Sequence, residues 1–223
     1  MTNPRTGQHH ARDFDLVPPF PSHNNQSIRM GGARTTDLAI DFGMINNDNI
    51  EQLKKINQAC FPVAYADTFY TDMANNSNVK QDENLCKFAY CNGFAVGAIC
   101  TRIENLVDTN NPTTTTTTTA TSGTTQRQCL YIMTLGVLAP YRNHRIGTKL
   151  VQSVIDYVQN EKASPTTGKK INAIDEIKLH VQTSNTDAIH FYCTKFGFEK
   201  GELIENYYKR IDPPHCYILR KKL

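Results

Sequence analysis

Hydrophobic and polar residues follow a helical period in four parts of the chain. Apolar residues recur every three or four positions over residues 49–59 and, more briefly, over 67–74. A longer run has six apolar residues on one helical face: Ile146, Leu150, Val151, Val154, Ile155 and Val158. The last run starts at the capping residues Ser184 and Asn185 and ends at Gly197. Its apolar face consists of Ile189, Tyr192 and Phe196. The pattern therefore predicts four helices.

Seven further segments have the composition and period of strands. They are residues 38–43, 86–92, 93–103, 129–138, 176–182, 198–204 and 216–223. Asn92 and Gly93, between the second and the third, predict a hairpin turn. Segment 129–138 is apolar on both faces, as in a central strand. Segment 176–182 alternates instead, and its polar face carries Lys178, His180 and Gln182. Because strands and helices are interspersed, we predict an α/β fold.

Two segments fit neither period. Residues 1–36 are rich in Pro, Asn, His, Arg and Gly, with few hydrophobic residues, and we interpret them as a disordered tail. Residues 107–128 contain an uninterrupted Thr run between two predicted strands, which indicates an expanded hairpin loop. Such insertions cost little closure entropy, so we favour repeat expansion over a modified or partner-binding loop. Residues 37–223 are thus predicted to form one domain that carries this insertion.

Charge and cysteine content narrow the function classes. Lys and Arg total 24 against 21 Asp and Glu, without a basic block, so we expect no direct binding to nucleic acid. The seven cysteines form no C-x-x-C pair and no H-E-x-x-H is present, so we expect no metal. We expect reduced thiols in the cytoplasm, with a nuclear pool as an open alternative. The start lacks a signal peptide's apolar region, and no apolar run is long enough to span a membrane.

Residues 130–150, "LYIMTLGVLAPYRNHRIGTKL", carry the most informative chemistry. A buried strand leads through a basic, glycine-containing loop into a helix, whose first N–H groups and positive dipole end attract anions. The Arg142 guanidinium suits phosphate oxygens, and Gly147 lets the backbone approach a ligand closely. From the pattern alone, a phosphate-binding turn and an ordinary connection with solvated arginines are equally good interpretations.

This segment resembles motif A of the GNAT superfamily, which binds the coenzyme A pyrophosphate through the signature R/Q-x-x-G-x-G/A. The stretch "LHVQTSNTDAIHFYCTKFGFE" resembles motif B, with Asn185, Ala188 and Tyr192 in its pattern. Together with "CFPVAYADTFY" and "NYYKRI", residues 37–223 resemble NatE-type (San-like) N-terminal α-amino acetyltransferase catalytic subunits. The resemblance implies the GNAT fold, a central mixed twisted sheet of about seven strands flanked by about four helices. It also implies acetyl-CoA as co-substrate.

The resemblance assigns roles to individual residues. Tyr131 and His180 would act together as the base, through an ordered water. The cofactor residues would be Leu135, Gly136 and Val137 for the pantetheine arm, Arg142, Asn143, His144, Arg145, Ile146, Gly147 and Thr148 for the pyrophosphate, and Asn185 and Tyr192 near the thioester. The substrate residues would be Phe61, Pro62, Val63 and Tyr65 in one loop and Tyr207, Tyr208 and Ile211 in another. The substrates would be protein N-termini, especially those that retain the initiator Met, and the partners the NatA complex and the ribosome.

The residues themselves leave alternatives open. His180 has a side-chain pKa suited to a base near neutral pH, but without the resemblance the default interpretation is a satisfied histidine within a sheet. Tyr131 could be a core aromatic residue, and Tyr192 either a proton donor to the leaving thiolate or a core residue. The "FPVAY" loop could plug the core, and Tyr207 and Tyr208 could form an exposed hairpin edge. Strand 129–137 contains no Asp or Glu, which favours α-amine over lysine substrates.

One position departs from the signature: Arg145 occupies the place of the first glycine. A side chain there could collide with the ligand or require an unfavourable backbone angle. We expect Arg145 to point away from the pyrophosphate, either solvated or toward the 3′-phosphate of coenzyme A. Two other functions stay open, namely a lysine or small-amine acetyltransferase and a coenzyme-A-binding scaffold in a larger complex.

Overall fold

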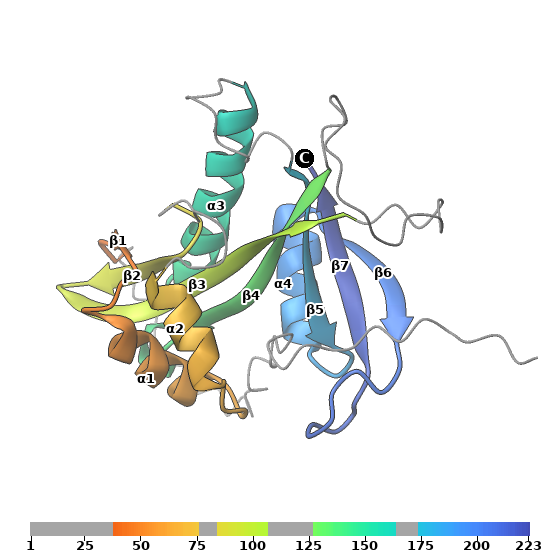
Figure 1. Cartoon of the computed structure of the whole chain (residues 1–223), viewed down its shortest axis with the longest axis horizontal. Helices are drawn as coiled ribbons and strands as arrows, with labels where there is room; N and C mark the ends of the chain where they lie inside the picture. The colour runs from red at the N-terminus through yellow and green to blue at the C-terminus, as the bar shows by residue number, and fades with distance from the viewer. Residues whose placement is uncertain (1–37, 76–83, 107–126, 164–173) are drawn as a thin grey trace, which may run out of the picture.

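The computed structural model describes residues 38–75, 84–106, 127–163 and 174–223 (Figure 1). Its seven strands form one sheet in the order β1-β2-β3-β4-β5-β7-β6. The strands are β1 (Asp41–Met44), β2 (Lys87–Cys91), β3 (Phe94–Asn105), β4 (Gln128–Val137), β5 (Ile174–Gln182), β6 (Glu199–Ile204) and β7 (Cys216–Lys222). The helices are α1 (Ile50–Cys60), α2 (Asp67–Asn75), α3 (Ile146–Ala163) and α4 (Thr186–Phe196), with a short 3-10 turn η1 (Ala139–Tyr141). The predicted α/β architecture is confirmed.

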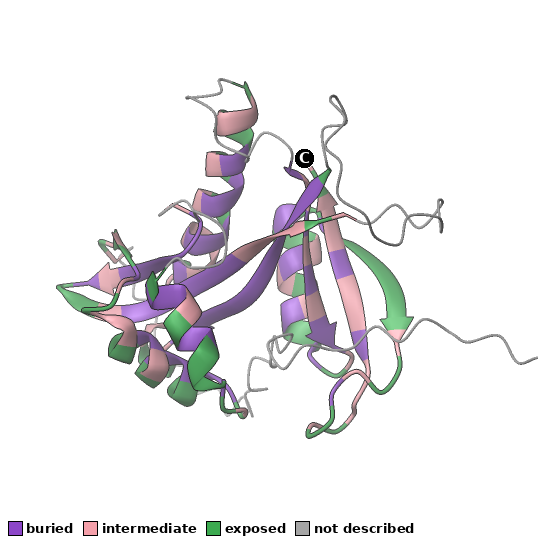
Figure 2. Cartoon of the chain, in the orientation of Figure 1, coloured by how far each residue is buried: buried purple, intermediate pink, exposed green. Residues whose placement is uncertain are grey.

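The helices cover opposite faces of the sheet and create two apolar cores. Helices α3 and α4 pack on one face, where the predicted apolar face of α3 and, on α4, Tyr192 and Phe196 are buried in one cluster, whereas Ile189 of the predicted α4 face is half-buried. Helices α1 and α2 pack on the other face and enclose a second cluster that includes Phe69, Phe88 and Tyr131. All ten residues of β4 are buried between these layers (Figure 2). The apolar run predicted for this central strand is therefore explained by burial on both faces.

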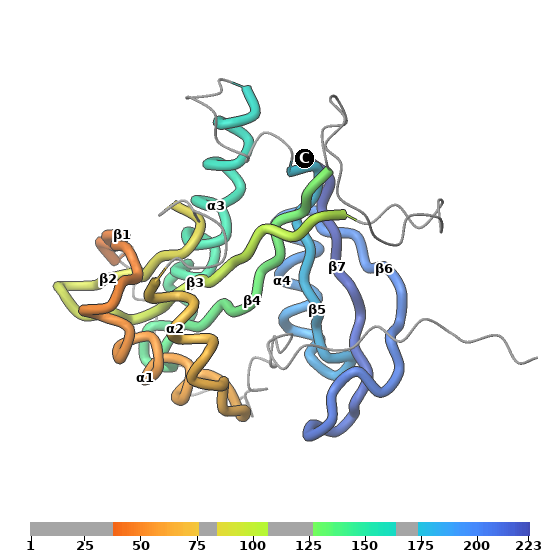
Figure 3. Tube along the Cα trace, viewed as in Figure 1, coloured from red at the N-terminus to blue at the C-terminus, as the bar shows by residue number. Residues whose placement is uncertain are grey.

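Strands β4 and β5 separate in the middle of the sheet. They are parallel, and their pairing runs from Gln128 opposite Ile174 only as far as Tyr131 opposite Lys178. Beyond that pair β4 continues to Val137 along β3, whereas β5 continues to Gln182 along β7. Figure 3 shows the two strands diverging toward their carboxyl ends. The sheet therefore has an opening between two central strands, where the facing backbone edges of β4 and β5 do not pair with each other.

Local details agree with most of the predicted boundaries. Asn92 and Gly93 have φ values of 49° and 79°, as a two-residue hairpin turn requires. Gly197 ends α4 in the left-handed conformation with φ of 68°. The first strand was placed too early, because β1 begins at Asp41 and the preceding residues pack beside α3, where Lys149 Nζ donates to the Leu38 carbonyl at 3.3 Å.

Gln182 departs from its predicted polar face. It is buried, and its side-chain amide donates to the Pro213 carbonyl at 2.8 Å. All seven cysteines are free thiols. No helix of the described ranges is long and apolar enough to cross a membrane. The predicted tail (residues 1–36) and nearly all of the Thr-rich insertion (107–126 of 107–128) lie outside the described residues.

Candidate active site

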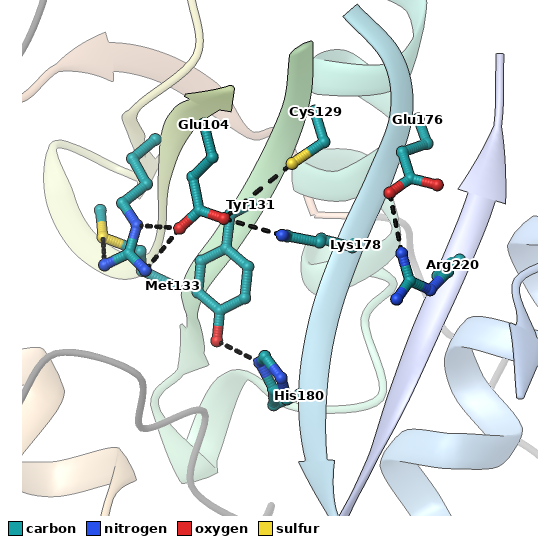
Figure 4. A network of polar contacts seen from close by, with 9 residues as sticks. Glu104, Cys129, Tyr131, Met133, Glu176, Lys178, His180 and Arg220 are labelled. Carbon is teal, nitrogen blue, oxygen red and sulfur yellow. Dashed lines mark hydrogen bonds and ion pairs between the residues drawn. The ribbon is translucent and has the colours of Figure 1, made fainter. Parts of the chain in front are cut away.

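Tyr131 and His180 meet where β4 and β5 separate. Tyr131 is the last β4 residue that pairs with β5, and His180 lies two positions beyond its partner Lys178 on the same face. The Tyr131 hydroxyl and His180 Nδ1 are 2.9 Å apart, within hydrogen-bonding distance (Figure 4). Tyr131 is buried and His180 half-buried, so the pair reaches from the core to an accessible edge. The two residues that the resemblance paired are therefore in direct contact.

Two cations flank the Tyr131 ring and a carboxylate bridges them, and sequence reasoning assigned a role to none of the three. Arg102 and Lys178 are its cross-strand neighbours on β3 and β5, at 4.7 Å and 6.0 Å from the ring centroid. Glu104 binds both cations, through an Arg102 contact of 2.6 Å and a Lys178 contact of 2.8 Å. Burial alone would raise the pKa of Glu104, but Arg102 and Lys178 hold it below its usual value. The available signal was the two-residue spacing that places Arg102 with Glu104, and Lys178 with His180, on one strand face.

The first predicted substrate loop lies between α1 and α2, beside the Tyr131 face. Phe61 and Tyr65 are buried in the same apolar cluster as Tyr131, with their ring centroids 5.9 Å apart. Burial raises the pKa of Tyr65 well above its usual value. Val63 is half-buried and Pro62 is exposed. Phe61 and Tyr65 therefore plug the core, with Val63 packed against the same cluster, and Pro62 is the exposed residue of the four.

The second predicted substrate loop, between β6 and β7, contacts His180. The Tyr207 ring stacks on the His180 imidazole, with centroids 4.6 Å apart and planes 15° apart. Tyr208 is buried, and its N–H donates to the Pro214 carbonyl at 2.9 Å. Ile211 is half-buried. Tyr208 is thus no exposed hairpin edge, and Tyr207 fixes the outer side of the imidazole.

The end of β4 has the edge expected of a pantetheine-binding strand. Leu135, Gly136 and Val137 pair with β3 along one edge, while β5 has already diverged from the other. A Cβ at Gly136 would come within 3.3 Å of Cys60 Cβ and Sγ, so glycine lets α1 pack closely here. Backbone N–H and C=O groups that lack a strand neighbour can bind an extended ligand as another strand would.

The turn between β4 and α3 differs from its expected form at Arg142. The Arg142 Nε donates to the Val137 carbonyl at 2.9 Å, so the side chain folds back onto the strand instead of extending from the turn. The first N–H groups of α3 (Ile146, Gly147 and Thr148) still lack intrahelical partners, as at every helix start. A Cβ at Gly147 would find its nearest atom, of Phe191, at 3.8 Å, so no contact within the described protein requires glycine there.

Arg145 adopts the unfavourable angle that its position implied. Its φ is 60°, in the left-handed region, and its side chain is exposed. Its carbonyl accepts the Lys149 N–H at 2.9 Å and so begins α3. Asn143, two residues earlier, has φ of 67°. The turn therefore keeps the backbone path of a glycine-containing loop with an arginine in place of the glycine.

Asn185 and Tyr192 each have a buried polar group without a hydrogen-bond partner among the described residues. Asn185 Oδ1 accepts the Ala188 N–H at 3.2 Å and caps α4, whereas its Nδ2 is buried without a partner among the described residues. The Tyr192 hydroxyl is likewise buried and unpaired, and burial raises its pKa well above its usual value. Buried polar groups normally have partners, so these two are candidates for ligand contacts.

Comparison with known proteins decides the family. The family model of the GNAT acetyltransferases matches residues 50–198. The chain belongs to the GNAT family of acetyltransferases. Among curated GNAT relatives, it is 40% identical to "N-alpha-acetyltransferase 50" of Danio rerio over 184 residues, which cover 82% of this chain and 89% of the relative. It is 38% identical to "Probable N-acetyltransferase san" of Drosophila melanogaster over 188 residues, or 84% of this chain and 83% of the relative.

Solved structures of acetyltransferases are also similar to this chain. Arabidopsis thaliana Naa50 in complex with the bisubstrate analogue CoA-Ac-MVNAL is 36% identical, with a TM-score of 0.62, and the match covers 82% of this chain and 99% of that one. Arabidopsis thaliana NAA60 in complex with acetyl-CoA is 20% identical, with a TM-score of 0.63. The match covers 83% of this chain and 100% of that one. The second likeness shows the fold alone. The GNAT fold and the San-like type of GNAT sequence predicted above are confirmed.

Proposed function

We propose that this GNAT enzyme transfers the acetyl group of acetyl-CoA to the α-amine of protein N-termini. The observation that carries the proposal is the contact of 2.9 Å between the Tyr131 hydroxyl and His180 Nδ1 at the opening between β4 and β5. The similarity to N-alpha-acetyltransferase 50 and to Arabidopsis Naa50, over most of the chain, supports the same activity. Acetyl-CoA fits the unpaired β4 edge and the α3 start on one side of this opening, and the peptide fits the loops on the other.

The Tyr131–His180 pair supplies the proton transfer that acetylation requires. An ammonium must lose a proton before its nitrogen can attack the thioester. When Nδ1 of His180 is unprotonated, it accepts the phenolic proton of Tyr131 while the phenol oxygen takes one from the ammonium, directly or through a water. The amine then forms the C–N bond, the C–S bond breaks, and the nitrogen loses its second proton while the coenzyme A thiolate takes one up. The Tyr192 hydroxyl is the candidate group for this last step, giving its proton to the thiolate and regaining the one released by the nitrogen.

The acceptor chemistry favours an α-amine over a lysine side chain. An α-amine has a pKa of about 7.7–8.0 against about 10.4 for lysine, a gap of roughly 2.5 units or ~3.4 kcal/mol. The α-amine therefore needs only a mild base near neutral pH. Glu104, which binds the two cations beside Tyr131, is held by Arg102 and Lys178 at 2.6 Å and 2.8 Å, so it supports neither a strong base nor a lysine site.

We propose that substrates retaining the initiator Met are preferred. Phe61, Val63 and Ile211 give the loops an apolar character, and burial of a Met side chain contributes about 1.5–3 kcal/mol. The analogue bound to Arabidopsis Naa50 begins with Met, which agrees with this choice. Association with the NatA complex and the ribosome, in the cytoplasm, belongs to the same proposal and rests on the San-like resemblance.

A competition assay read by mass spectrometry tests the proposal. The peptide mixture contains Met-Val, Ser and Ala N-termini on one common sequence, and an N-terminally blocked peptide that carries a lysine is the control. We expect the Met-Val peptide to be acetylated fastest and the blocked peptide not at all. Faster reaction of the Ser or Ala peptides would contradict the Met preference, and acetylation of the blocked peptide would support a lysine acetyltransferase. Binding of acetyl-CoA without turnover on any peptide would support a scaffold.

A further inference from the structure

A cross-strand row of charged residues holds Tyr131 from both sides. Arg102, Tyr131 and Lys178 are in register on β3, β4 and β5, so their side chains lie next to one another on one sheet face. The Arg102 guanidinium lies 4.7 Å from the Tyr131 ring centroid, close enough for a cation–π contact, and Lys178 Nζ lies 6.0 Å from it. The ring is thus placed between two cations that come from different strands.

Glu104 joins the two cations into one unit. One carboxylate oxygen contacts Arg102 at 2.6 Å and 2.7 Å, and the other contacts Lys178 at 2.8 Å. Figure 4 shows these bonds next to the Tyr131–His180 contact. The three charged side chains are 20–24% exposed, so solvent screens them less than it screens surface pairs. Without the carboxylate, two long side chains of equal charge would repel each other and regain rotamer freedom.

We propose that Glu104 is a positioning residue for catalysis, acting through Arg102 and Lys178 on the Tyr131 ring. The phenol oxygen must stay within hydrogen-bonding distance of His180 and of the incoming amine at once, and small displacements of reacting groups lower rates steeply. Among the described residues Glu104 contacts Arg102, Lys178 and Cys129, and both cations lie beside the Tyr131 ring, so its effect reaches the chemistry through Tyr131. This inference rests on the catalytic role proposed above for Tyr131.

The matched control is Glu176. It lies on β5 opposite Cys129, the β4 residue that also faces Glu104, so both carboxylates belong to the same cross-strand row. Glu176 pairs with Arg220 at 3.0 Å, on the side of β5 away from Tyr131. Glu104→Gln and Glu176→Gln therefore remove the same charge and one ion-paired carboxylate each, from neighbouring places. Only Glu104→Gln removes the carboxylate that holds Arg102 and Lys178 beside the Tyr131 ring.

The experiment measures kcat and KM of both variants with a Met-Val peptide, together with thermal unfolding. We expect Glu104→Gln to lower kcat about tenfold, or ~1.4 kcal/mol, with an unchanged KM for acetyl-CoA. Glu176→Gln should stay within about twofold of wild type. Lys178→Met, which keeps the aliphatic stem but removes the charge, should lower kcat in the same direction. If thermal unfolding shows that all variants are folded, a lower kcat in Glu104→Gln and Lys178→Met but not in Glu176→Gln indicates positioning and not general destabilisation.

A double-mutant cycle with Tyr131→Phe then locates the effect. If Glu104 acts through the Tyr131 hydroxyl, Glu104→Gln should cost less than about twofold in the Tyr131→Phe background, because coupled residues are not additive. An equal loss in both backgrounds, or the same loss in Glu176→Gln, would overturn the positioning role. A wild-type kcat for Glu104→Gln beside an inactive Tyr131→Phe would overturn it while leaving the proposed function intact. Full activity of Tyr131→Phe would overturn the catalytic role of Tyr131, and the positioning role with it.

Discussion

The ring of Tyr207 lies flat on the imidazole of His180, with centroids 4.6 Å apart and planes 15° apart. Tyr207 comes from the loop between β6 and β7, and His180 from β5, so this stack joins the second substrate loop to the candidate base. At the edge of the imidazole, Nδ1 lies 2.9 Å from the Tyr131 hydroxyl. The orientation of the imidazole therefore depends both on this loop and on Tyr131.

Replacements of Tyr207 should separate stacking from peptide binding. Aromatic pairs contribute about 0.5–1.5 kcal/mol beyond their buried area, so Tyr207→Ala should lower kcat between about twofold and tenfold. Tyr207→Phe keeps the stack and should keep kcat, while its KM for peptide rises because a hydroxyl able to bond the peptide backbone is lost. Steady-state kinetics on both variants measures this split. Equal kcat values in Ala and Phe variants would show that the stack does not hold the imidazole.

The Tyr131–His180 pair should be essential to turnover. His180→Ala and Tyr131→Phe each remove one partner of the proton transfer, and general-base help contributes about 100- to 10,000-fold. We expect kcat to fall within that range in both variants, while acetyl-CoA affinity from calorimetry stays near wild type, since neither residue lies at the turn before α3. If both variants turn over within a factor of about two of wild type, the pair is not the base.

Tyr192 can be tested through stability and turnover together. Its hydroxyl is buried with no hydrogen-bond partner in the described part of the chain, and such a group costs about 1–3 kcal/mol. Tyr192→Phe should therefore raise the free energy of unfolding of the ligand-free protein by about 1 kcal/mol. If the hydroxyl donates to the leaving thiolate, kcat should fall at least about tenfold in the same variant. A more stable protein with unchanged kcat would assign Tyr192 to the core alone.

The sequence predicts the elements well because burial imposes a period on each of them. The apolar face of α3, the two-sided run of β4 and the Asn92–Gly93 turn all follow from local rules. The surroundings of Tyr131 do not, because Glu104 and Lys178 reach it from two other strands and only the register brings them together. The direction of the Arg142 side chain and the burial of Tyr208 also escape prediction, since irregular loops have no period.

Glu104 should make the stability of the protein depend on pH in the acid range. Its neighbours are Arg102 on its own strand, Lys178 on β5 and the Cys129 thiol on β4, at 2.6 Å, 2.8 Å and 4.0 Å. Although burial opposes them, the two cations lower its pKa below the usual 4.5. A carboxylate with a lowered pKa in the folded state stabilises the protein above pH 4.5, and this contribution is lost as the pH falls through the lowered pKa.

Denaturant unfolding of wild type and Glu104→Gln at several pH values measures this contribution. We expect the variant to be less stable by about 1 kcal/mol at pH 7, and the difference to shrink steadily below about pH 4.5. The Glu176→Gln variant serves again as the comparison for general loss of a carboxylate. A stability difference that stays constant down to about pH 2 would mean that the ionised Glu104 is not its source.

The backbone of Arg145 is strained, because it adopts a left-handed conformation that glycine would adopt without cost. A non-glycine residue in that conformation costs about 1–2 kcal/mol, partly offset by the greater freedom of glycine in the unfolded chain. Arg145→Gly should therefore raise the free energy of unfolding by about 0.5–1 kcal/mol. Asn143→Gly is the matched control, since asparagine tolerates its φ of 67° and the gain should be smaller.

The same variants address acetyl-CoA binding. Because the Arg145 side chain is exposed, Arg145→Gly should change the acetyl-CoA Kd by no more than about tenfold, or ~1.4 kcal/mol. Arg142→Ala should weaken binding more, since it removes the cation and also releases the Val137 carbonyl at the end of the β4 edge. Calorimetry on wild type and both variants compares them. If the wild-type protein fails to bind acetyl-CoA and Arg145→Gly restores binding, the arginine has disabled the site, and the enzymatic function proposed above is wrong.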